Sequence, residues 1–284
     1  MKIQLSLPVL SFLSWPMTTL FLAGPVGAQI NIWSGATNGN WNTTTNWANN
    51  AVPNAAGTDV IFNSSGLNQA SLNLSAATTI RSMYLYGGNY TLSPTAAEVL
   101  TIQGGGFTQL GSGTFTLNNN ILGVASNDLT FNGNGSGAIT LNGTINNLAQ
   151  RWDKWNESNV TLTNGYTSTT NSNIALRVRA GSLILSGAGS ITQVTAGAQI
   201  TVGAGSTFNA GVWHNNANAA LVLDNTGTNN LDRITNANQI NTSVRSLIEL
   251  KGNASAASSE TLGILNASGP GSQIRVSHGS GPPD

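Results

Sequence analysis

Apolar residues in this chain occur in short runs that alternate with polar residues and stop at glycine or asparagine. A two-residue period places one side chain inward and the next outward, which is typical of a half-buried β-strand. The chain is therefore predicted to consist of short strands. These runs are found at residues 59–62, 82–86, 98–102, 113–117, 128–131, 138–141, 160–162, 182–185, 199–202, 221–223 and 246–250.

The segments between the runs are rich in glycine and asparagine, as in Gly104-Gly105-Gly106 and at residues 132–135. Both residues tolerate positive φ, so each cluster predicts a sharp corner. No segment of a dozen residues shows helical spacing with caps. Strands recurring about every ten residues fit either a sandwich or a parallel β-helix.

Short, glycine-interrupted strands and the high asparagine content favour the β-helix, because amides at the same position on stacked turns can form ladders. We expect an all-β, right-handed parallel β-helix, or β-solenoid, whose short strands are separated by Gly and Asn. Turns of about 20 residues would give about a dozen turns. The expected order is a signal peptide at 1–28, a Trp-rich cap at 29–65, solenoid repeats at 66–276 and a disordered tail at 277–284.

The signal peptide is predicted from three features of the N-terminus. Lys2 supplies a positive charge, residues 3–22 are mostly apolar, and Val26-Gly27-Ala28 offers the small residues of a cleavage site before Gln29. The alternative is an N-terminal membrane anchor, which Pro8, Pro16 and the interspersed hydroxyl residues disfavour. We therefore expect a secreted or cell-surface, outer-membrane-associated protein, with no membrane-spanning segment in the mature chain.

Charged residues make up only 7% of the chain and the net charge is zero, so it has no field to attract nucleic acid. It has no cysteine, which excludes disulfides and thiolate metal sites. The Gly104-Gly105-Gly106 run lacks the aspartate of a calcium-binding repeat, so we expect no metal or other cofactor. A monomer is expected.

The N-terminal order of tryptophans, a proline and a strand resembles the opening of autotransporter passengers with autotransporter-associated β-strand repeats. It comprises Trp33-Ser34-Gly35, Asn40-Trp41, Asn46-Trp47, Val52-Pro53 and Asp59-Val60-Ile61-Phe62. Further similar units lie at residues 88–92, 100–106, 230–234 and 250–263. Complete members continue into a C-terminal translocator barrel, and none follows Ile274, so either a longer chain or another route of release is expected.

The densest charged stretch, Arg151 to Glu157, carries the candidate chemistry. Asp153 and Glu157 could be the paired carboxylates of a glycosidase, with Trp152 and Trp155 as platforms for sugar rings. The simpler interpretation is an exposed loop whose charges pair with one another. We expect these four residues to bind a ligand rather than to catalyse, and no catalytic residue is assigned.

Other residues offer less chemistry. Two histidines, His214 and His278, are too few for a three-histidine zinc site. Trp33, Trp41 and Trp47 could form a carbohydrate platform, but a cap over the open end of the first turn is favoured.

The sequence thus predicts a non-enzymatic exported surface protein, an autotransporter-type passenger that acts as a structural stalk or adhesin. Its partner would be a surface polysaccharide or a ligand on a host or neighbouring cell. The alternative is a secreted β-helix carbohydrate-active enzyme or carbohydrate-binding protein.

Overall fold

A computed structural model describes residues 29–124, 128–148, 152–155, 157–168, 174–193, 199–202, 219–236, 239–267 and 270–278. The expected signal peptide, the sequence through residue 28, lies outside the described residues. Of the expected tail, residues 279–284 also lie outside. Ser277 is the last residue of a strand rather than part of a disordered tail.

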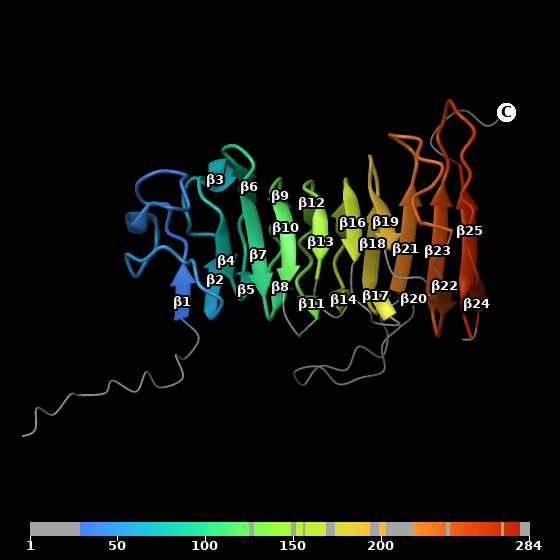
Figure 1. Cartoon of the computed structure of the whole chain (residues 1–284), viewed down its shortest axis with the longest axis horizontal. Helices are drawn as coiled ribbons and strands as arrows, with labels where there is room; N and C mark the ends of the chain where they lie inside the picture. Colours follow the sequence, from blue (N-terminus) through green and yellow to red (C-terminus); the bar gives the residue numbers. More distant parts are fainter. Residues whose placement is uncertain are drawn as a thin grey trace, which may run out of the picture.

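The described residues form three parallel β-sheets wound into a solenoid of about seven turns, which confirms the predicted all-β solenoid class (Figure 1). No α-helix occurs among them, and the two 3-10 helices are η1 (Thr44–Asn46) and η2 (Gln69–Ser71). None of the helices in the described part of the chain is long and apolar enough to cross a bilayer.

The three sheets are named here by size. Sheet 1 has ten described strands: β1 (Gln29–Ile32), β2 (Thr58–Phe62), β5 (Ser82–Leu85), β8 (Gly106–Gln109), β11 (Leu129–Asn132), β14 (Trp152–Lys154), β17 (Ile174–Val178), β20 (Gln199–Val202), β22 (Gln239–Thr242) and β24 (Leu265–Ala267). Sheet 2 has nine: β3 (Leu72–Leu74), β6 (Tyr90–Pro94), β9 (Phe115–Leu117), β12 (Ile139–Leu141), β15 (Val160–Leu162), β18 (Gly181–Leu185), β21 (Ala219–Asp224), β23 (Ser246–Lys251) and β25 (Gln273–Ser277). Sheet 3 has six: β4 (Thr78–Ile80), β7 (Val99–Gln103), β10 (Asn120–Val124), β13 (Ile145–Asn147), β16 (Gly165–Ser168) and β19 (Ser190–Gln193).

From β2 to β19, each turn takes one strand from each sheet in succession, and the described strands after β19 alternate between sheets 1 and 2. Met83 aligns with Phe107 and Phe107 with Phe131, so a turn takes 24 residues here (107 to 131). The expected dozen turns of about 20 residues were wrong, because three strands and three corners need a longer repeat. Side chains that share a position in successive turns therefore stack along the axis.

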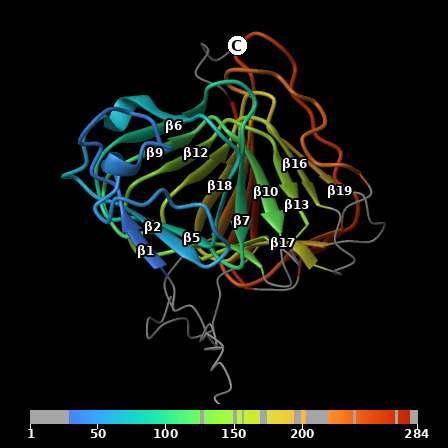
Figure 2. The same cartoon turned by 60° about the vertical axis from the view of Figure 1, so that its left-hand side comes forward.

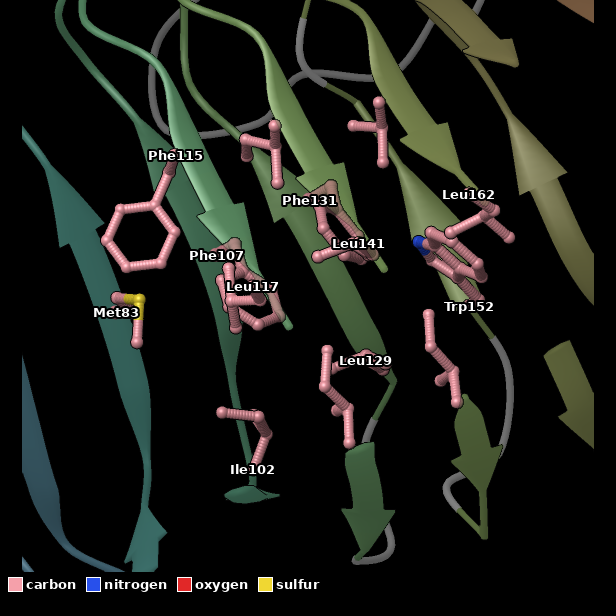
Figure 3. Close-up of a cluster of buried hydrophobic side chains, with 14 of the residues drawn as sticks. Met83, Ile102, Phe107, Phe115, Leu117, Leu129, Phe131, Leu141, Trp152 and Leu162 are labelled. Atoms are coloured by element: carbon pink, nitrogen blue, oxygen red, sulfur yellow. The ribbon is translucent and has the colours of Figure 1, made fainter. Parts of the chain in front are cut away.

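Apolar side chains fill the interior in continuous ladders (Figure 3). On sheet 2, Leu92, Leu117, Leu141 and Leu162 align turn by turn and are at most 1% exposed. Burying a leucine side chain contributes about 2 kcal/mol, so each turn is stabilised mainly by the neighbours above and below it.

The N-terminal segment is itself the first turn of the solenoid, at one end of the molecule (Figure 2). After β1 pairs with β2, Asn40 forms a parallel bridge with Asn73 at β3. The side chain of Asn54 then accepts a hydrogen bond from the backbone N–H of Thr79 in β4. The segment thus follows the same three sheets as the turns from β2 to β19.

Three tryptophans, Trp33, Trp41 and Trp47, fill this first turn. Each is at most 1% exposed, and their rings pack edge to face at centroid distances of 4.8 and 5.0 Å. Each indole N–H donates to a main-chain carbonyl oxygen at 2.7 to 3.1 Å. Buried rings of this kind cannot stack on a sugar, so they offer no carbohydrate platform.

The corner before sheet 2 is built from a column of glycines, Gly88, Gly113 and Gly137, in successive turns. A Cβ added to Gly113 would lie 1.8 Å from the carbonyl oxygen of Gly88, and one added to Gly137 would lie 1.8 Å from that of Gly113. The turns approach so closely at this corner that no other residue fits.

We predict that Gly113→Ala lowers the free energy of unfolding by about 2 kcal/mol or more, because the new methyl group must push two turns apart. Thermal and urea unfolding followed by circular dichroism would measure it. Gly57→Ala is the matched control, since a Cβ there has no neighbour within 4 Å. Equal effects of the two substitutions would contradict the close packing at this corner.

Candidate functional site

The stretch from Arg151 to Glu157, which the sequence singles out, contains β14 in the middle of sheet 1, between β11 and β17. Trp152, Asp153 and Lys154 are only 0 to 2% exposed. The expected exposed loop was therefore wrong for these three residues. The alternation of side chains continues through them, although two of the three are charged.

Trp152 lies in the solenoid interior. Its ring centroid is 4.9 Å from that of Phe131 and 5.0 Å from that of Tyr166, and Figure 3 shows Trp152 among the buried apolar side chains that include Phe131. A ring enclosed on this side of the sheet has no face for a ligand. It stabilises the core and does not act as a platform for a sugar.

Asp153 points outward and joins adjacent turns through arginines rather than through its sequence neighbours. Its Oδ1 accepts a hydrogen bond from the Nε of Arg179 at 3.0 Å, and its Oδ2 pairs with Arg177. The Nη2 of Arg177 also lies 3.8 Å from the Oδ2 of Asp128, one turn before Asp153. No side chain in this cluster of four charged residues is more than 20% exposed.

Trp155 and Glu157 are the two candidate residues at the surface. The guanidinium carbon of Arg179 lies 4.2 Å from the centroid of the half-buried Trp155 ring, in a cation–π contact. Glu157 is exposed and lines a shallow depression of about 360 Å³, together with Asn134, Ser136 and Asn159. The four predicted residues therefore divide between the core, the ion cluster and the surface.

Lys154 is the residue that the sequence reasoning missed. It aligns with Phe131 and Val178, both buried core residues, so its side chain points into the interior. Its Nζ donates to the carbonyl oxygens of Ser158 at 2.9 Å and Ala180 at 2.6 Å. The signal was its position two residues after Trp152, since residues i and i+2 of a strand share a face.

Burial lowers the pKa of Lys154 to about 7, because the charged ammonium group loses its hydration inside the solenoid. Its two carbonyl contacts hold the loop after β14 against the next turn. We interpret Lys154 as a structural residue whose charge is costly, not as a nucleophile or base, because the core encloses it.

The remaining candidates are the two histidines. His214 lies outside the described residues, and His278 is exposed near the C-terminal end. Within the described ranges, no group of three or more His, Cys, Asp or Glu side chains could hold a metal ion.

The chain was compared with protein-family models, with curated proteins and with solved structures, and none of them matches it.

We predict that stability rises by roughly 3 kcal/mol between pH 7 and 9.5 because of Lys154. Its folded pKa is about 7, while an unfolded lysine titrates at about 10.4, so the unfolded chain binds more protons in this range. Urea unfolding across this range should show the slope in the wild type and none in Lys154→Met.

The partly exposed Lys251 provides the control, since Lys251→Met should keep the wild-type slope. The measurement stops at pH 9.5 because burial raises the pKa of Tyr90 to about 12, and above about pH 10 this tyrosine lowers stability as pH rises. A slope that survives in Lys154→Met would show that another group causes it.

We predict that Asp153→Asn lowers the free energy of unfolding by about 3 kcal/mol, because two poorly exposed arginines lose their carboxylate. Glu249→Gln should cost about 1 kcal/mol or less, since its partner Arg275 is 55% exposed. Chemical denaturation of both variants would compare them. A larger loss at Glu249 would contradict the difference in burial.

Proposed function

We propose that this chain is a non-enzymatic exported protein that acts as an extended structural or adhesive element at the cell surface, as an autotransporter passenger does. The observation that carries the proposal is the continuous stack of parallel turns, built by a chain of which only 7% of the residues are charged. Such a stack holds its function on long faces rather than in a pocket.

Side-chain ladders tie the outer surface of adjacent turns together. On sheet 2, Asn118 donates to the hydroxyl of Ser93 at 2.8 Å, and Asn142 donates to the side chain of Asn118 at 2.8 Å. Thr163 then donates to Asn142 at 2.6 Å. These bonds run along the solenoid axis, so a load applied to one turn is shared with its neighbours.

Charged side chains on the outer faces pair between turns instead of forming a field. Asp59 pairs with Arg81, and Glu249 lies 2.9 Å from Arg275. With ten basic and ten acidic residues in the chain, this pairing favours a neutral ligand such as a surface polysaccharide over nucleic acid.

Trp155 and Glu157 are the proposed ligand contacts. Both reach the surface close to the end of β14, and the ring of Trp155 is held by Arg179, which Asp153 in turn positions. An amphipathic ring at the surface can stack on a sugar. Glu157, two residues further along the chain, lies among the polar side chains of the surface depression and can bond the hydroxyl groups of a ligand. A ligand on a host or neighbouring cell would use the same contacts.

The experiment is expression of the full chain, with its own N-terminal segment, in a Gram-negative host. We expect a mature protein that begins at Gln29 and is digested by protease added to intact cells. Purified protein should bind surface polysaccharides less well after Trp155→Ala, and should release no reducing ends from them.

Two results would overturn the proposal. One is a cytoplasmic protein with an intact N-terminus. The other is the release of reducing ends from a polysaccharide, if Glu157→Ala abolishes this release and the core-facing variant Trp152→Phe retains it. That result would establish a carbohydrate-active enzyme instead.

A further inference from the structure

The outer face of sheet 2 carries a regular row of threonines. Thr91 aligns with Thr116, Thr116 with Thr140, and Thr140 with Thr161, so the row crosses four consecutive strands. All four residues are partly exposed. None of their hydroxyl groups bonds to another residue of the described chain, so each is available to a ligand.

A second row runs beside the first, two residues further along each strand. It consists of the hydrogen-bonded ladder Ser93, Asn118, Asn142 and Thr163. The two rows together are called the hydroxyl array. Its repeat is about 4.8 Å along the solenoid axis and about 6.6 Å along the strands, as strand spacing and rise dictate.

The array is rigid for three reasons. Threonine is β-branched, so its χ1 angle is restricted. The amides of the second row are already bonded to their neighbours. Beneath both rows, Leu92, Leu117, Leu141 and Leu162 are at most 1% exposed and hold the strands in register. A ligand that matches the array therefore binds with little loss of side-chain entropy.

The chemistry of the array restricts its ligand. Each threonine presents a methyl and a hydroxyl group, and the row contains no charge or aromatic ring. Beyond Thr161 the same row continues with Ile184 and Val222, and reaches Glu249 only three turns later. Without charge the array does not select an ionic lattice, and without aromatic rings it does not stack on sugars.

A regular repeat in two directions is useful only to a ligand that repeats in two directions. A single glycan chain repeats in one direction and can follow only one of the two rows, and a protein loop has no constant repeat. A crystalline lattice of neutral hydrogen-bonding groups can contact both rows at once, because its own groups repeat in two directions. The axial repeat of the array is close to the oxygen repeat along one direction of a prism face of hexagonal ice, and the repeat along the strands is somewhat shorter than the second oxygen spacing of that face.

We propose that the hydroxyl array of sheet 2 binds ice. Its hydroxyl groups would take lattice positions of water oxygens, and its methyl groups would order the water between them. This activity is additional to the surface role and does not depend on the polysaccharide contacts at Trp155 and Glu157.

The test is ice-affinity partition of the full chain, in which slowly growing ice either incorporates or excludes a labelled protein, followed by microscopy for faceted crystals. Thr116→Tyr/Thr140→Tyr should abolish incorporation, because the large rings hold the face away from ice. Thr101→Tyr/Thr167→Tyr is the matched control, since these threonines are partly exposed on outward positions of sheet 3.

A second variant, Thr116→Ser/Thr140→Ser, keeps the hydroxyl groups and removes only two methyl groups, and it should also lose incorporation while keeping the thermal unfolding curve of the wild type. Exclusion of the wild-type chain from ice would overturn the proposal. Equal incorporation of the sheet 2 and sheet 3 tyrosine variants would overturn it as well. Binding to microcrystalline cellulose or chitin without incorporation into ice would reassign the array to a crystalline polysaccharide.

Discussion

The in-register parallel pairing between successive turns is the interaction on which the rest of this structure depends. Because the strands repeat in register, a residue meets its counterparts one turn above and one turn below. Apolar positions therefore form ladders inside the solenoid, and threonine and asparagine form ladders outside. Each turn is stabilised almost entirely by its two neighbours, which is the energetic pattern of a repeat protein.

The sequence predicts much of this fold, because the period of two and the glycine corners are local signals. β9, β12 and β15 all lie within predicted runs. It could not predict β14, whose three residues include an acid and a base, because periodicity is recognised from apolar residues. Nor could it predict that Asp153 pairs with Arg177 and Arg179, since that contact requires the register across a 24-residue turn (153 to 177).

Of the candidate site, only Trp155 and Glu157 reach the surface. The sequence indicated a cluster of charges and tryptophans but not the side of the sheet on which each residue lies. The alternation of side chains along the strand decides this, because Trp152 and Lys154 point inward and Asp153 points outward. The same alternation places the threonines of the hydroxyl array on the outer face of sheet 2. Surface chemistry in this molecule is therefore a property of whole faces rather than of one cleft.

The most direct test of the central claim uses the absence of cysteine from the natural chain. Thr116→Cys/Thr140→Cys places two thiols on aligned residues of adjacent strands, about 5 Å apart and within disulfide range. Thr140→Cys/Asn164→Cys has the same separation of 24 residues but is out of register, because Thr140 aligns with Thr161. The in-register solenoid predicts rapid oxidation of the first pair and little of the second. Equal rates in the two variants would contradict it.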